Sequence, residues 1–253
     1  MPEVTTHRTS RLGLGRGVSE LRAFVEAALL DPVDEPPMQT GRQLLRRRIV
    51  VVVTIAVGAV ALGLALDIAP GDVSFYPAAL GVAALWMVGA VASGPLHLGR
   101  GRTRSGGGSR GVLQGFLLGL GLLVVFLLGA VVVGRIPVLR RPVDDLLAHA
   151  AHGSLPIVAA ITFVNGVAEE LFFRGAVYSS SPRRWAIPVS TLCYAASTLW
   201  SGVPLLTFGA LCLGLLTSAQ RRVTGGVAGP IAAHLTWSLG MLLLLGPALS
   251  LGD

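Results

Sequence analysis

Two adjacent acids and a base lie in an otherwise apolar stretch of the chain. Glu169 and Glu170 are followed by Arg174 within residues 155–179, where most other side chains are apolar. A charged side chain at the centre of a bilayer costs about 3 kcal/mol on insertion scales, so such residues should face protein or water. This pattern favours a functional site, and the plainer alternative is an ion pair that locks helices together.

Helical geometry gives the two glutamates different neighbours. Successive residues of an α-helix point about 100° apart, so Glu169 and Glu170 cannot share one face. Glu170 and Arg174 are four residues apart with the acid first, the order that favours an ion pair. Glu169 has no base four residues later, and Asn165 precedes it by four. We therefore interpret Glu170 and Arg174 as a brace and Glu169 as the candidate general base.

Two further pairs of polar residues share helix faces in other apolar segments. His234 and Ser238 are four residues apart within residues 225–248, and Tyr194 and Thr198 have the same spacing within 185–201. At about 1.5 Å per residue, Glu169 and His234 lie at a similar depth, roughly 15 Å from the arginine-rich ends of their segments. The matched depth predicts that His234 belongs to the same site as Glu169.

A metal site is the less favoured use of these residues. Catalytic zinc generally has three protein ligands, and only Glu169, Glu170 and His234 are within reach, without an HExxH motif. His152 lies roughly 25 Å from Glu169 along a helix, too far to help. We expect no cofactor, with a divalent metal such as zinc on Glu169 and His234 as the alternative.

The composition indicates what must hold these residues. Of 253 residues, 53% are hydrophobic and 13% are charged, and the mean hydropathy is +0.71. Average soluble domains have about 25% charged residues. We predict an all-α polytopic transmembrane bundle. About seven segments are candidate spans: 49–67, 75–93, 112–134, 155–179, 185–201, 203–219 and 225–248. Residues 137–150 mix apolar and charged side chains, which suits an interfacial helix.

The basic residues set the orientation and the domain boundaries. The net charge of +7 comes from arginine alone, in clusters beside the apolar segments, and such clusters mark the cytoplasmic side. We expect a cytoplasmic N-terminus, a largely disordered cytosolic tail over 1–48, transmembrane helices over 49–136, and the core of the protein over 155–248. The clusters suit contact with the lipid bilayer. No basic face on a soluble domain indicates a nucleic-acid partner.

The run Glu169–Gly175 resembles the EExxxR motif of the CPBP (Abi) family of intramembrane proteases. This family includes the CAAX prenyl proteases of the Rce1 type and bacteriocin-processing relatives. Its core continues with an FxxxH helix and closes with an HxxxN helix, in the order and spacing of the polar segments here. The resemblance implies that Glu169 activates water, with Glu170 and Arg174 in support, and that His234 stabilises the oxyanion of peptide hydrolysis. It implies a membrane-associated peptide or protein substrate, and we expect the bacterial plasma membrane as the location.

The chain departs from the family pattern at two positions. Tyr194 and Thr198 occupy the FxxxH position, so the family's histidine is missing, and Ser238 stands for the asparagine of HxxxN. Serine still offers a hydrogen-bond donor, whereas threonine cannot take a proton near pH 7. Three functions follow: an intramembrane endopeptidase, a catalytically lapsed pseudoprotease that binds a membrane partner, or a small transporter that uses the buried carboxylates.

Overall fold

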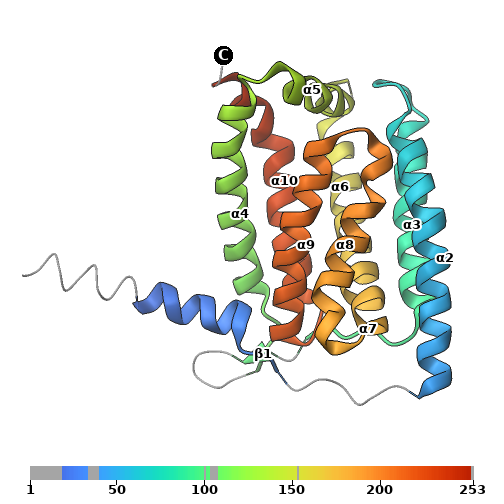
Figure 1. Ribbon diagram of the computed structural model, residues 1–253. Coiled ribbons are helices and arrows are strands. Elements are labelled where there is room, and N and C mark those ends of the chain that lie inside the picture. Colours follow the sequence, from blue (N-terminus) through green and yellow to red (C-terminus); the bar gives the residue numbers. More distant parts are fainter. Residues whose placement is uncertain (1–18, 34–39, 100, 103–107, 153, 252–253) are drawn as a thin grey trace, which may run out of the picture.

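The chain folds into an all-α membrane bundle, as its composition predicts (Figure 1). The computed structural model describes residues 19–33, 40–99, 101–102, 108–152 and 154–251. The long helices are α2 (Gly41–Leu66), α3 (Phe75–Ser93), α4 (Val112–Val133), α6 (Leu155–Glu170), α8 (Ala186–Ser197), α9 (Pro204–Thr224) and α10 (Ala228–Ser250). The helix α5 (Pro137–Ala151) lies between α4 and α6. The shorter elements are η1 (Glu26–Leu30), η2 (Leu171–Val177), α7 (Tyr178–Ser180), η3 (Arg183–Trp185) and η4 (Leu199–Ser201). The strands β1 (Gly101–Arg102) and β2 (Gly108–Ser109) pair antiparallel between α3 and α4.

Five helical runs in the described part of the chain are long and apolar enough to cross a membrane. They are Gly41–Leu66, Phe75–Ser93, Val112–Val133, Leu155–Ser180 and Ala228–Ser250. The other two expected spans correspond to α8 and α9. With 12 residues, α8 rises about 18 Å, less than the hydrocarbon thickness. The helix α9 ends at Thr224 and carries Gln220, Arg221 and Arg222 near that end. Seven crossings and the cytoplasmic N-terminus stay predictions.

The first long helix begins earlier than the apolar pattern indicates. Thr40 and Gln43 form a capping box, in which the Thr40 hydroxyl accepts from the Gln43 backbone and the Gln43 side chain accepts from the Thr40 backbone. As a result α2 starts at Gly41 instead of near residue 49, and its arginine-rich first turns are helical. Of the tail expected over 1–48, residues 1–18 and 34–39 lie outside the described residues, and 19–30 are helical.

Glycines allow α4 and α10 to pack closely. A Cβ atom on Gly119 would lie 2.9 Å from Ala233 Cα, and one on Gly115 would lie 2.9 Å from Gly229 C. Both glycines lie on one face of α4, a spacing that brings helices together in membranes. This contact fixes the height of His234, the residue that follows Ala233.

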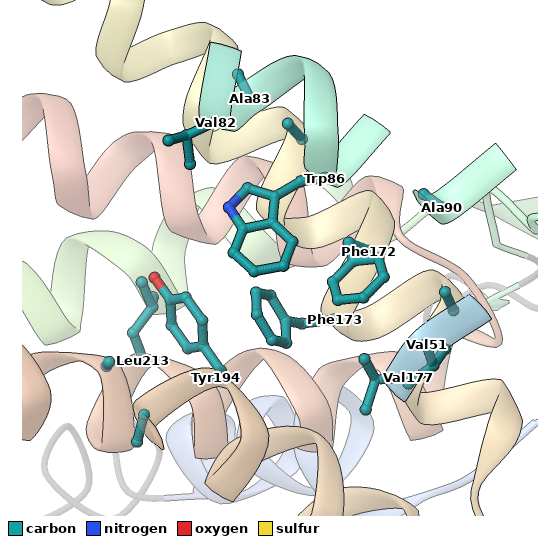
Figure 2. Packing of buried hydrophobic residues seen from close by; sticks show 14 of the residues in the cluster. Val51, Val82, Ala83, Trp86, Ala90, Phe172, Phe173, Val177, Tyr194 and Leu213 are labelled. Carbon is teal, nitrogen blue, oxygen red and sulfur yellow. The ribbon is translucent and has the colours of Figure 1, made fainter. Parts of the chain in front are cut away.

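A cluster of buried aromatic side chains packs inside the bundle, and Figure 2 shows Trp86, Phe172, Phe173 and Tyr194 in it. Trp86 of α3 is fully buried, and its ring lies 4.9 Å from Phe172 and 5.1 Å from Phe173, measured between centroids. Phe173 in turn lies 4.9 Å from Tyr194 of α8. The cluster therefore packs the helix that carries the glutamates against α3 on one side and α8 on another.

Candidate active site

The two glutamates lie where a helix changes its winding. Regular α6 ends at Glu170, and the chain continues as the wider π-helix η2 before α7. Wide turns of this kind are rare and occur frequently at functional sites. The sequence predicted one continuous helix over 155–179. The chain is helical throughout this range, but residues 171–177 are π-helical instead of α-helical.

Three other helices hold this wide turn through its backbone. Their side chains donate to three successive carbonyl oxygens of η2: Ser190 Oγ to Phe173 O at 2.8 Å, Arg221 Nε to Arg174 O at 3.0 Å, and Arg47 Nη1 to Gly175 O at 3.4 Å. Each donor is buried. Because these side chains come from α8, α9 and α2, the position of η2 depends on the whole bundle.

A buried carboxylate joins a guanidinium and an imidazole. Glu170 Oε1 lies 3.1 Å from Arg174 Nη1 and 2.8 Å from His234 Nδ1. The side chains of Glu170 and Arg174 are both 0% exposed. Gly214 of α9 gives the guanidinium room, since a Cβ there would lie 3.4 Å from Arg174 Nη2. The predicted brace therefore exists as an ion pair, and His234 is its third member.

Glu169 is the more accessible of the two acids. Its side chain is 15% exposed. Tyr194 Oη donates a hydrogen bond to Glu169 Oε2 at 2.8 Å, and His234 Nε2 lies 3.8 Å from the same oxygen. The imidazole thus stands between the two glutamates, with one nitrogen on Glu170 and the other facing Glu169.

Two other residues considered in the sequence turn elsewhere. Asn165 Nδ2 donates to Ala79 O at 3.2 Å and to Ile161 O at 3.1 Å, so its amide faces α3 and not Glu169. Thr198 Oγ1 lies 2.8 Å from Ala195 O and 3.1 Å from Thr207 Oγ1, at the start of α9. The observed contacts of these two side chains therefore lie outside the carboxylate cluster.

Ser238 lies one turn after His234 on α10. Its Oγ is buried and has no hydrogen-bond partner among the described residues. A buried hydroxyl without a partner is costly, and such groups are often kept for a ligand or a reaction.

Tyr194 contacts Glu169 and is absent from the candidate site residues predicted from the sequence. The spacing places Tyr194 and Thr198 on one helix face, and the family pattern directs attention to Thr198. The signal that could have found it is chemical, because a buried tyrosine hydroxyl in an apolar helix generally has a hydrogen-bond partner. The nearest partner at that depth is Glu169.

Residues 151–240 match the family model described as type II CAAX prenyl endopeptidase Rce1-like. This part of the chain is similar to the Rce1-like family. The match covers η2, α8 and the cluster from Glu169 to Ser238, and it confirms the resemblance seen in the motifs. The family is one of proteases. No curated protein and no solved structure matches the chain.

No group of three or more His, Cys, Asp or Glu side chains in the described residues could hold a metal ion. Of the three ligands considered from the sequence, Glu170 already pairs with Arg174 and with His234 Nδ1.

Proposed function

We propose that this chain is an intramembrane endopeptidase that hydrolyses a membrane-associated peptide or protein in the bacterial plasma membrane. The observation that carries the proposal is the placement of Glu169. It is a partly exposed carboxylate that faces Nε2 of the His234 imidazole. The other nitrogen, Nδ1, contacts the buried Glu170, which pairs with Arg174. The match of residues 151–240 to a protease family supports the same chemistry.

The gap between Glu169 and His234 suits a water molecule. Glu169 Oε2 and His234 Nε2 are 3.8 Å apart, too far for a direct hydrogen bond. One water can hydrogen-bond to both groups across such a distance. The His234 Nε2 faces the water, and its Nδ1 lies 2.8 Å from Glu170 Oε1.

Hydrolysis follows from this arrangement. Glu169 takes a proton from the water as the water oxygen bonds to the peptide carbonyl carbon, which becomes tetrahedral. His234 Nε2–H and the Ser238 hydroxyl then donate to the oxyanion. When the C–N bond breaks, Glu169 returns the proton to the departing amine. Glu170 and Arg174 touch no reacting atom and act as positioning residues for His234.

A second function, a pseudoprotease, is favoured by one observation. Thr198 stands where the family has a histidine, and its hydroxyl contacts Ala195 and Thr207. If the lost histidine is essential, the same site would bind a membrane peptide without cleaving it.

Cleavage by the reconstituted protein separates these functions. Purified protein in lipid vesicles is given a library of membrane-tethered peptides, and the products are identified by mass spectrometry. Glu169→Gln should lower the cleavage rate by about 10² to 10⁴, the usual contribution of a general base. Asp145→Asn, on the exposed face of α5, is the matched control and should cleave like the parent.

Two results would argue against the proposal. Equal cleavage by the parent and Glu169→Gln would remove Glu169 from the mechanism. Saturable binding of a peptide that the parent never cleaves would establish the pseudoprotease.

A further inference from the structure

The hydroxyl of Tyr194 reaches the acid that the mechanism uses. Tyr194 is 7% exposed, and its Oη donates to Glu169 Oε2 at 2.8 Å. A phenol in the interior of a membrane bundle needs a hydrogen-bond partner, because no bulk water replaces one. The partner here is the carboxylate that faces His234, and the contact is made to the same oxygen, Oε2.

Three neighbours fix the Tyr194 ring. The guanidinium carbon of Arg174 lies 4.6 Å from the ring centroid, the Phe173 ring lies at 4.9 Å and the His234 ring at 6.2 Å. A cation over an aromatic face is attracted to it, more strongly where water is excluded. Figure 2 shows the ring lying beside Phe173 in the aromatic cluster. These ring contacts therefore fix the position of the Tyr194 hydroxyl.

Arg174 connects the buried brace to the exposed acid. The same guanidinium pairs with Glu170 at 3.1 Å and lies over the ring of Tyr194. Tyr194 in turn hydrogen-bonds to Glu169. The carboxylate of Glu169 ends in a torsion with broad energy wells, so without such a contact it would turn freely.

We propose that Tyr194 is a positioning residue for Glu169 and holds its carboxylate toward His234 through the Oη to Oε2 hydrogen bond. The contact between α8 and the acid comes from Tyr194, whereas Thr198, one turn later, contacts α9. The consequence for catalysis rests on the proposed endopeptidase function. The hydrogen bond itself can be tested without it.

Tyr194→Phe tests the contact, because it removes the hydroxyl and keeps the ring. An infrared difference spectrum between the parent and Glu169→Gln isolates the carboxyl band of Glu169. That band should shift in Tyr194→Phe, since a phenol hydrogen bond changes the stretching frequency of the oxygen that accepts it. Tyr178→Phe is the matched control, a buried tyrosine whose ring lies over Arg221, and it should leave the band in place.

The same variants are then compared in the cleavage assay. Tyr194→Phe should lower kcat by up to about 10²-fold with little change in KM, because a misplaced catalytic group costs rate more than binding. Thermal unfolding of each variant in detergent separates this loss from misfolding.

The outcomes distinguish this proposal from the proposed function. An unshifted band in Tyr194→Phe overturns the positioning role, whatever the activity. A shifted band with unchanged or increased kcat also overturns it, because the hydroxyl would then be idle or inhibitory. If the parent cleaves no peptide while the band still shifts, the endopeptidase proposal fails and the contact between Tyr194 and Glu169 stands.

Discussion

Adjacent glutamates in this chain have different surroundings, and the difference assigns their tasks. Glu170 is 0% exposed and shares one oxygen between Arg174 and His234, whereas Glu169 is 15% exposed and receives a hydrogen bond from Tyr194. Glu170 thus contacts Arg174 and His234 directly, whereas Glu169 Oε2 stands 3.8 Å from His234 Nε2. The same substitution should therefore cost more stability at Glu170 than at Glu169, whereas Glu169 is the position where it should remove the general base.

Glu170→Gln should destabilise the fold far more than Glu169→Gln. Without Glu170, Arg174 is a buried cation without a counter-charge, which typically costs about 3 to 5 kcal/mol. In Glu169→Gln the amide oxygen can still accept from Tyr194, so the loss should stay below about 1.5 kcal/mol. Unfolding of both variants in detergent measures the difference. Combining Glu170→Gln with Arg174→Met should recover part of the loss, and equal destabilisation by the two single changes would contradict the assignment.

Ser238→Ala should separate activity from stability. The Ser238 hydroxyl is buried without a partner in the described residues, so its removal breaks no observed bond and the melting temperature should stay level or rise. If Ser238 donates to the oxyanion, kcat should fall by about 10² to 10³. Ser250→Ala, on the exposed last turn of α10, is the control and should change neither quantity. A Ser238→Ala enzyme with parental kcat would exclude Ser238 from the mechanism.

For single residues, helical spacing predicted contacts within one helix but not the contacts that a side chain makes with a neighbouring helix. The spacing of Glu170 and Arg174 gave their ion pair, and matched depth brought His234 to them. Spacing could not show that Asn165 faces α3 or that Tyr194 and not Thr198 reaches Glu169. Those outcomes depend on which neighbouring helix each face meets, and a single sequence with one helical period does not specify that.

The wide turn of η2 shows why the local sequence pattern did not predict the type and the boundaries of every helix. An apolar segment with helical spacing predicts a helix over 155–179, and a helix is present. Its change of winding at Leu171 goes with donors that come from far along the chain, among them Ser190 and Arg221. Similarly, the start of α2 at Gly41 follows from a polar capping box that a search for apolar spans passes over.

Ser190→Ala should loosen this wide turn. It removes the hydrogen bond to Phe173 O, which keeps its backbone partner Tyr178 N–H, so the cost should be about 1 kcal/mol. Because η2 follows Glu170 directly, cleavage should also slow. Ser197→Ala on the same helix is the control, since Ser197 is equally buried and bonds within its own turn to Tyr194 O. Unfolding and hydrogen exchange of residues 171–177 measure the effect, and identical exchange in the two variants would contradict it.

Gly119→Ala should push α4 away from α10, and Gly121→Ala should not. A Cβ at Gly119 would lie 2.9 Å from Ala233 Cα and 3.0 Å from Ala233 C, and closer still to Ala233 O. A Cβ at Gly121 would have nothing within 4 Å. Backbone cannot move aside as a side chain can, so Gly119→Ala should destabilise by about 1 to 3 kcal/mol and displace His234. Gly121→Ala should be neutral or stabilising by up to about 1 kcal/mol through helix propensity. Unfolding in detergent and the cleavage rate compare them, and equal stability of the two variants would contradict the close packing.

For the molecule as a whole, composition predicted the class of fold and not the number of crossings. Five helical runs in the described residues meet the length and hydropathy of a span, and α8 with α9 accounts for the other two expected segments. The turn between α8 and α9 lies beside the last turns of α2, since a Cβ on Gly63 would be 2.9 Å from Trp200 Cβ. Two crossings by α8 and α9, or none, both leave the chain on the same side of the membrane. The direction in which α10 crosses is therefore the same in either case.

Cysteine labelling tests the orientation and the pair separately. In a background with Cys193 and Cys212 replaced, single cysteines go to Val73, Arg110 and Trp200, all exposed and each near a turn. With arginine-rich ends inside, an impermeant maleimide added to intact cells should label positions 73 and 200, and position 110 only after permeabilisation. Labelling of 110 and not 73 in intact cells would invert the whole bundle. Labelling of 73 with 200 protected from both sides would make α8 and α9 a re-entrant pair. The carboxylate cluster would then lie beside a pair of helices that enters and leaves the bilayer on the arginine-rich side.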